Sequence, residues 1–195
     1  KLQFKYKKCN YLRSYNPHVP LNIKAIESAA IMINHAEKPM ILAGHGVLLA
    51  KAENELLQFA EKTGIPVALT LLGLSAFPCG HRLYAGYLGM HGNYAPNLLT
   101  NEADLLIAIG MRFDDRVTSN LKKYAKKARI IHLEIDQAEI NKNVQVDLEI
   151  HSDAKEALQN LIPLVKQNSY ESWIREFRIC DKIEYDRVIK EETKP

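Results

Sequence analysis

The strongest constraint on the fold is an apolar run, Asp104-Leu105-Leu106-Ile107-Ala108-Ile109-Gly110, which ends at a glycine. A strand that is apolar at every position has to be covered on both faces, as happens in a parallel sheet packed between helices. Shorter runs of the same kind occur at residues 40–43, 66–70 and 130–135, with a weaker one at 146–150. The sequence therefore predicts a sheet built from several buried strands.

Helical patterns alternate with these runs. Apolar residues recur with a helical period over residues 23–33, 56–60 and 154–165, and a charged helical segment begins near Tyr170. Strands that alternate with helices indicate βαβ units with right-handed crossovers. We therefore predict an α/β fold with a parallel sheet.

Three parts are expected along the chain: a linker over residues 1–21, one domain over 22–168 and a helical tail over 169–195. The connection 71–97 is rich in glycine but also in apolar residues, which favours a functional loop over disorder. The sequence begins Lys-Leu-Gln-Phe-Lys, with no initiator Met and no signal-peptide pattern, so we expect a piece of a longer protein.

Composition excludes several classes of protein. The net charge of +3, from 26 basic and 23 acidic residues, is too small to predict nucleic-acid binding. No apolar run approaches the roughly 18 residues of a membrane-spanning helix. Cys9, Cys79 and Cys180 lie far apart without a CxxC pair, so we predict no disulfide framework, no zinc site and a reducing, cytoplasmic setting.

The residues that follow the strands predict where a ligand binds. In such sheets, ligands lie beyond the carboxyl ends of the strands. Gly44-His45-Gly46 follows the first run, Thr70-Leu71 the second, Gly110-Met111-Arg112 the strongest, and Glu134 and Asp136 the next. Glycine lets the main chain approach a pyrophosphate, arginine can donate two hydrogen bonds to phosphate oxygens, and a carboxylate can accept ribose hydroxyls. The pattern indicates a dinucleotide site.

Each of these signals has a plainer alternative. Gly44-His45-Gly46 lacks the third glycine of a complete GxGxxG motif, because Leu49 stands there, and a simple tight turn explains it equally. The segment 112–116, in which arginines flank two aspartates, can form a surface ion-pair ladder. Glu134 can be a solvated side chain.

Catalytic and metal sites are not predicted. Asp114 and Asp115 are adjacent, and adjacent carboxylates on an extended chain point apart, which disfavours a metal site. His45 and His91 flank glycines, but no Ser or Cys is placed to form a nucleophilic triad with either.

Two motifs together resemble the acetolactate synthase (acetohydroxyacid synthase) catalytic-subunit family. They are Leu88-Gly89-Met90-His91-Gly92 and Gly110-Met111-Arg112-Phe113-Asp114-Asp115-Arg116-Val117-Thr118. Segments 72–78, 131–143 and 13–17 are also similar to that family, so the resemblance runs over roughly residues 10 to 165. Other thiamine-diphosphate enzymes share the fold but rarely the whole Arg-Phe-Asp-Asp-Arg run.

The resemblance implies a three-layer Rossmann-like domain of the NAD/FAD-binding type, which lies in the middle of a thiamine-diphosphate enzyme and binds FAD. The full enzymes condense two pyruvates, or pyruvate and 2-oxobutanoate, with release of CO2, in branched-chain amino-acid biosynthesis. Thiamine diphosphate and Mg²⁺ act in flanking domains, and the flavin is structural. This sequence has no Gly-Asp-Gly motif with a downstream Asn, so we expect the chain alone to be inactive. Implied partners are the flanking domains, other copies of the enzyme and a regulatory small subunit.

Motif matching implies the residues that contact FAD. They are Gly44, His45 and Gly46 along the flavin's chain; Thr70, Leu71, Leu88, Gly89, Met90 and His91 around the flavin; Gly110, Met111, Arg112, Asp114, Arg116 and Val117 at the pyrophosphate and ribityl region; and Glu134, Ile135 and Asp153 at the adenosine end. The sequence departs from the family at His45, where a small residue is usual, at Gln137, where proline is common, and at Ser152, where glycine is common.

Two alternatives stay open at this point. One is a stand-alone cofactor-binding module of the same fold, similar to an electron-transfer flavoprotein or to an NAD-dependent deacylase. The other is a scaffold without a cofactor, which flavin absorbance in the purified protein would exclude.

Overall fold

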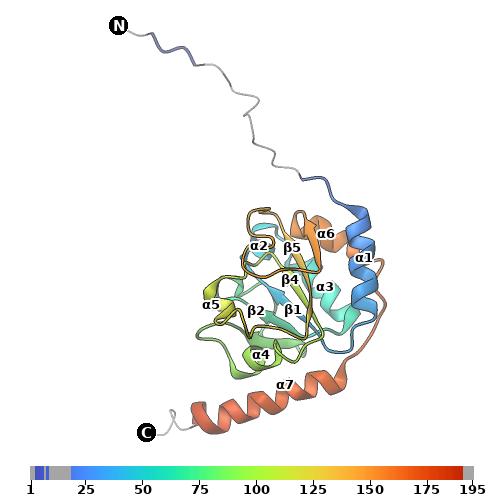
Figure 1. Ribbon diagram of the computed structural model, residues 1–195, viewed down its shortest axis with the longest axis vertical. Helices are drawn as coiled ribbons and strands as arrows, with labels where there is room; N and C mark the ends of the chain where they lie inside the picture. The colour runs from blue at the N-terminus through green and yellow to red at the C-terminus, as the bar shows by residue number, and fades with distance from the viewer. Residues whose placement is uncertain (1–2, 7, 9–18, 191–195) are drawn as a thin grey trace.

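The computed structural model describes residues 3–6, 8 and 19–190 (Figure 1). A parallel six-stranded sheet forms the centre, in the order β3-β2-β1-β4-β5-β6. The strands are β1 (Pro39–Ala43), β2 (Val67–Leu69), β3 (Tyr84–Tyr87), β4 (Leu105–Ile109), β5 (Arg129–Glu134) and β6 (Leu148–His151). The predicted α/β fold is confirmed. Strand order reverses between β1 and β4, which is where ligands bind in sheets of this topology.

The central pair of strands explains why the apolar runs are so continuous. β1 and β4 are buried at every position, and they pair in register from Pro39 opposite Leu105 to Ala43 opposite Ile109. Both faces of these strands are covered by helices, so neither strand has a position for a polar side chain. The apolar side chains of the two strands form the middle of the core.

Helices complete the three layers (Figure 1). One group consists of α1 (Ile23–Asn34), α3 (Glu53–Thr63) and α6 (Ala154–Leu161), and on the other side α4 (Tyr94–Leu99) lies along α7 (Glu171–Glu184). Four short elements complete the described chain: α2 (His45–Leu49), η1 (Leu71–Gly73), α5 (Asp115–Thr118) and the π-helical η2 (Tyr185–Ile189). No helix in the described ranges is long and apolar enough to cross a membrane.

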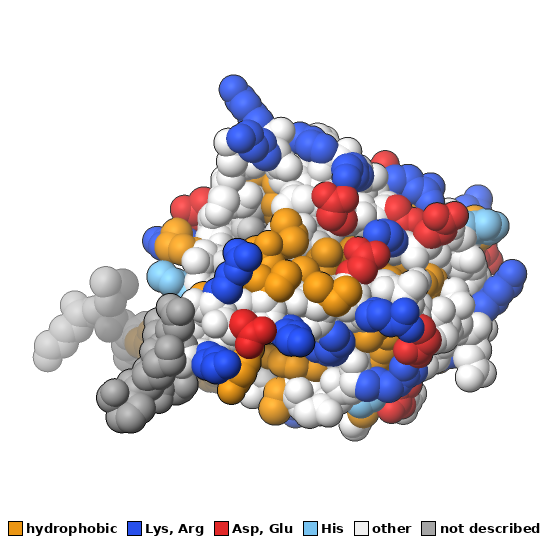
Figure 2. All heavy atoms as spheres, turned by 90° about the horizontal axis from the view of Figure 1, so that it is seen from below, with side chains coloured by type: hydrophobic (Ala, Val, Ile, Leu, Met, Phe, Trp, Pro, Cys, Tyr) orange, Lys and Arg blue, Asp and Glu red, His pale blue; other side chains and the backbone are white. Residues whose placement is uncertain are grey.

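Helix α7 is fixed to the starts of two strands. Trp173 and Phe177 are buried and stack edge to face with their ring centroids 5.0 Å apart. The indole Nε1 of Trp173 donates to the carbonyl of Pro39 at 2.9 Å, and Arg178 donates to the carbonyl of Tyr84 at 2.7 Å. Seen from the side of α7, apolar side chains gather in the middle of a face otherwise rich in charged groups (Figure 2).

Three local predictions need correction. The connection 71–97 contains η1, β3 and the start of α4; β3 escaped notice because it is a half-exposed edge strand interrupted by Gly86. Gly44-His45-Gly46 is the start of α2 rather than a simple tight turn. Helix α6 ends at Leu161, short of the predicted Val165. The linker predicted over residues 1–21, including Arg13-Ser14-Tyr15-Asn16-Pro17, falls largely outside the described residues, as do residues 191–195.

Candidate functional site

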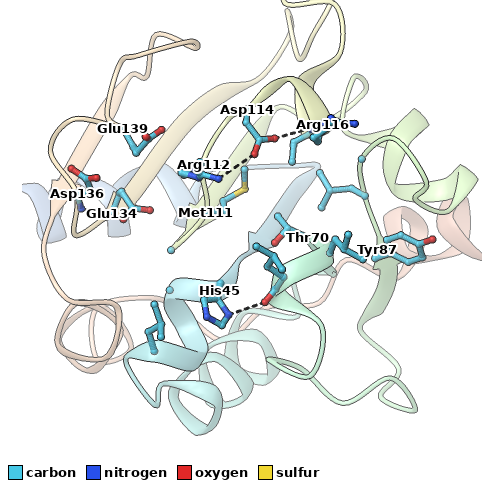
Figure 3. A pocket seen from close by; sticks show the side chains of 18 of the residues that line it. His45, Thr70, Tyr87, Met111, Arg112, Asp114, Arg116, Glu134, Asp136 and Glu139 are labelled. Atoms are coloured by element: carbon cyan, nitrogen blue, oxygen red, sulfur yellow. Dashed lines mark hydrogen bonds and ion pairs between the residues drawn. The ribbon is translucent and has the colours of Figure 1, made fainter.

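A cleft of about 660 Å³ opens at the carboxyl ends of the strands (Figure 3). Its volume is in the range of sites that hold cofactors and other small molecules. All the residues predicted to contact a cofactor line this cleft except Gly44 and Asp153. Five further residues line it: Leu49, Leu72, Tyr87, Asp136 and Glu139. The topology therefore brings together segments that follow β1, β2, β3, β4 and β5.

Glycines form the floor of the cleft by letting two backbones touch. A Cβ atom on Gly44 would lie 2.4 Å from the carbonyl oxygen of Gly110, and one on Gly46 would lie 2.6 Å from the Cα of Gly110. The N–H of Gly46 donates to that same carbonyl at 2.9 Å. The ends of β1 and β4 are thus in direct contact, and Gly44 supports the cleft from below instead of lining it.

Two arginines give one side of the cleft its positive charge. Arg112 Nη2 lies 3.7 Å from Asp114 Oδ2, and Arg116 Nε lies 3.9 Å from Asp115 Oδ2. The arginine side chains are 59% and 69% exposed, so these long ion pairs hold them weakly. Both guanidinium groups therefore keep donors that a phosphate can use.

The two aspartates between the arginines make different contacts. Asp114 Oδ1 accepts from the N–H of Val117 at 3.2 Å and caps α5, whereas Asp115 faces Arg116. Within the described residues, no group of His, Cys, Asp and Glu side chains is arranged to hold a metal ion.

The loop over residues 88–92 is fastened to both of its neighbours. The N–H of Met90 donates to the carbonyl of Arg116 at 2.7 Å. Asn97, on α4, accepts from the N–H of Gly89 at 2.8 Å and donates to its carbonyl at 3.0 Å. The loop is consequently held at the rim of the cleft, with the Met90 side chain exposed.

Glu134, Asp136 and Glu139 form the acidic side of the cleft and lie next to Arg112 (Figure 3). Glu134 is only 7% exposed, which contradicts the alternative of a solvated side chain. Its Oε1 accepts from the N–H groups of Ile135 at 2.9 Å and Asp136 at 3.1 Å. Burial raises the pKa of Glu134. The cleft thus brings two arginines and a buried carboxylate together at neighbouring strand ends.

Asp153 does not join the acidic side. Its carboxylate accepts from the N–H groups of Lys155 and Glu156 and caps the start of α6. The sequence did contain a signal for this capping role. Glu156 follows Asp153 by three residues, and this spacing of a carboxylate after an N-cap residue is typical of a helix N-terminus. Tyr87 lies on β3, the strand that the sequence did not predict. Glu139 lies in the segment after β5 and also lines the cleft.

Glu134→Gln should change how stability depends on pH. Because burial raises the pKa of Glu134, the folded state holds this proton more tightly than the unfolded chain. The free energy of unfolding therefore falls as pH rises from the ordinary glutamate range through the raised pKa. Glutamine removes this loss and keeps a side-chain oxygen as acceptor. In urea unfolding between about pH 4 and pH 7, the free energy of unfolding of the variant should increase relative to that of the parent as pH rises. The exposed Glu27→Gln serves as control; equal pH slopes for parent and Glu134→Gln would contradict the prediction.

Comparison with known proteins agrees with this architecture. Residues 26–161 match the family described as thiamine pyrophosphate enzyme, central domain. The chain is 39% identical over 194 residues to the acetolactate synthase large subunit of Buchnera aphidicola subsp. Schizaphis graminum, with 96% of this chain and 34% of that protein covered. It is 37% identical over 197 residues to the acetolactate synthase large subunit of Haemophilus influenzae, with the same shares covered. A probable acetolactate synthase large subunit of Methanocaldococcus jannaschii is 47% identical over 151 residues, 77% of this chain and 26% of that protein. The chain thus spans about a third of the first two relatives.

Proposed function

The chain belongs to the family of thiamine pyrophosphate enzyme central domains, and from that premise we propose that it is the central domain of an acetolactate synthase large subunit whose cleft binds FAD. The whole enzyme would join two pyruvates, or pyruvate and 2-oxobutanoate, and release CO2. Thiamine diphosphate and Mg²⁺ would supply that chemistry outside this chain. The observation that carries the FAD assignment is that one cleft is lined by Arg112, Arg116, Glu134 and the close-packed glycines Gly46 and Gly110.

The residues of the cleft suit FAD in three respects. Gly46 and Gly110 present bare main chain at the topological switch point, where a pyrophosphate can approach. Arg112 and Arg116 are weakly paired and can bind its phosphate oxygens. Glu134, at the end of β5, is placed to accept ribose hydroxyls. In this proposal Thr70 and residues 88–91 lie around the flavin ring, while Gly44 and Asp153 act on the protein's own structure.

The apolar side chains at the mouth of the cleft support the proposal that this domain is part of a larger enzyme. Leu49, Leu71 and Leu72 are 73%, 65% and 67% exposed. Side chains of this kind at the mouth of a cleft are typical of a surface that another domain covers. We propose flanking domains of the same protein as that cover, with other copies of the enzyme and a regulatory small subunit as further partners. The cytoplasmic setting stays a prediction from the cysteines.

Titration of flavin fluorescence tests the proposal on the 195-residue chain. We expect saturable but weak FAD binding, with a dissociation constant on the order of micromolar, because the exposed rim leaves much of the ligand uncovered. AMP is a useful competitor, since it carries only the adenosine and one of the two phosphates of FAD. Absence of binding at millimolar FAD would overturn the FAD assignment, and nanomolar affinity would contradict the role given to a covering domain.

Activity provides a separate test. With pyruvate, thiamine diphosphate and Mg²⁺, the chain alone should form no acetolactate, because its sequence lacks the Gly-Asp-Gly motif expected to hold the diphosphate. Acetolactate production would contradict this expectation. Bleaching of bound flavin by a physiological electron donor would instead favour the electron-transfer alternative.

A further inference from the structure

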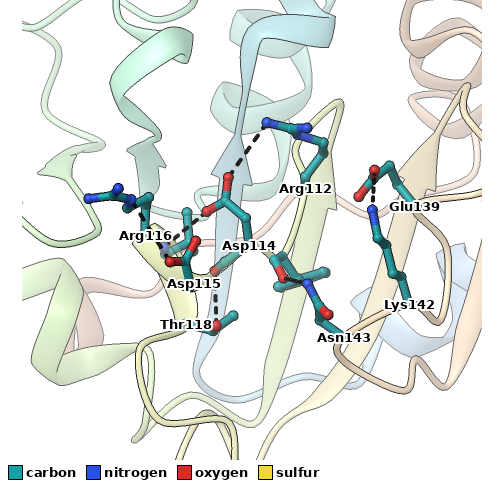
Figure 4. Close-up of polar contacts among 10 residues, drawn as sticks. Arg112, Asp114, Asp115, Arg116, Thr118, Glu139, Lys142 and Asn143 are labelled. Carbon is teal, nitrogen blue, oxygen red and sulfur yellow. Dashed lines mark hydrogen bonds and ion pairs between the residues drawn. The ribbon is translucent and has the colours of Figure 1, made fainter.

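The main chain on both sides of Arg112 is held by side chains from another part of the chain. His132, on β5, places Nε2 2.8 Å from the carbonyl oxygen of Met111. Asn143, in the segment after β5, donates from Nδ2 to the carbonyl oxygen of Phe113 at 2.8 Å (Figure 4). Arg112 therefore lies between two braced peptide groups. The two donors thus connect the backbone around Arg112 to β5 and to the segment that follows it.

The state of His132 follows from its surroundings. A carbonyl oxygen can only accept, so Nε2 carries the ring proton and Nδ1 is a bare acceptor. His132 is fully buried, and its ring meets that of Phe113 edge-on with centroids 5.0 Å apart. Burial lowers the pKa of His132, which keeps the ring neutral. Nδ1 has no hydrogen-bond partner in the part of the chain that the structure describes.

An unpartnered buried nitrogen is unfavourable, and an apolar side chain at this position would avoid it. What an apolar side chain lacks is the Nε2–H donor that reaches Met111. Asn143 is exposed, so its contact adds little to the core and acts mainly on the position of Phe113. Both side chains therefore have their clearest effect on the backbone that carries Arg112.

We propose that His132 and Asn143 are positioning residues, which fix the Met111–Phe113 backbone so that the Arg112 guanidinium is directed into the cleft toward a bound pyrophosphate. The ligand in this inference rests on the proposed FAD function. Neither residue lines the cleft itself, so each acts through Arg112 rather than by touching the cofactor.

Two variants remove the brace, and two others control for what they disturb. Asn143→Ala deletes an exposed donor and should fold normally. His132→Leu deletes the buried donor, and His132→Gln restores an N–H near the position of Nε2. Gln145→Ala is the matched control, because that exposed amide donates to the carbonyl of Asn141 at 3.0 Å, away from Arg112.

The first measurement needs no ligand. Trypsin cleaves after arginine, so its rate of cleavage after Arg112 reports how firmly this backbone is held. Asn143→Ala and His132→Leu should raise that rate at least about threefold, whereas Gln145→Ala and His132→Gln should stay near the parent. Unchanged cleavage in both brace variants would overturn the inference, whether or not FAD binds.

The second measurement is FAD affinity by fluorescence titration. Asn143→Ala should weaken binding by about three- to tenfold, the loss expected for one hydrogen bond. In the Arg112→Ala background this further loss should vanish, because positioning residues act through Arg112; an undiminished loss would overturn that route. If the parent bound no FAD while the trypsin result held, the proposed function would fail and the brace would lose its assigned ligand.

Discussion

Arg112→Ala is expected to weaken FAD binding by about 100-fold while leaving the stability of the domain nearly unchanged. A guanidinium that binds phosphate contributes charge-assisted hydrogen bonds worth about 1.5–3 kcal/mol, and about 2.7 kcal/mol corresponds to 100-fold. The folded protein loses little, because Arg112 is 59% exposed and its ion pair with Asp114 is 3.7 Å long. Flavin fluorescence titration and thermal unfolding measure the two effects.

Arg129→Ala is the matched control for this variant. Arg129 is also exposed, but it stands at the start of β5, at the end of the sheet opposite the cleft. Its removal changes the net charge equally and should leave FAD affinity within about twofold of the parent. Equal losses in the two variants would show that overall charge, and not the position of Arg112, governs binding. Arg112→Lys should recover only part of the affinity, since lysine presents a point charge instead of a fork of donors.

The sequence predicted the central strands well because their signal is local. Strand β4 is apolar throughout, and a strand with both faces covered by helices has no position that favours a polar side chain. Strand β3 was missed because an edge strand has no such constraint, and Gly86 within it reads as a loop residue. Strand ends were easy to collect into one site, since parallel strands place all their carboxyl ends at one edge.

Features that depend on the folded arrangement of the chain could not be predicted from the sequence. The low exposure of Glu134, 7%, cannot be inferred from its strand-end position. The braces from His132 and Asn143 join residues far apart in sequence, to backbone carbonyls that any residue type supplies. Asp153 shows the converse: its match to a family position suggested a ligand contact, whereas its local setting, before a helix, governs its actual hydrogen bonds.

Gly110→Ala should destabilise the domain by about 3–4 kcal/mol. Gly110 has φ +56°, where alanine costs about 1–2 kcal/mol. The new Cβ would also lie 2.7 Å from the Cα and 2.8 Å from the carbonyl carbon of Gly46. Both are backbone atoms, so relief requires the ends of β1 and β4 to separate, and overpacking of this kind costs about 1–3 kcal/mol more. The unfolding midpoint should fall by about 10 °C.

Gly80→Ala shows whether this loss comes from the contact or from adding any side chain to a loop glycine. A Cβ on Gly80 would meet no heavy atom within 4 Å, so its stability should stay within about 0.5 kcal/mol of the parent. Separation of β1 from β4 would also move Gly46 and Arg112 apart across the floor of the cleft. Gly110→Ala should therefore lose FAD affinity even at temperatures where it is folded, whereas Gly80→Ala should not. A stable Gly110→Ala variant with parental FAD affinity would mean that the two strand ends do not touch, and the site built on their contact would have to be abandoned.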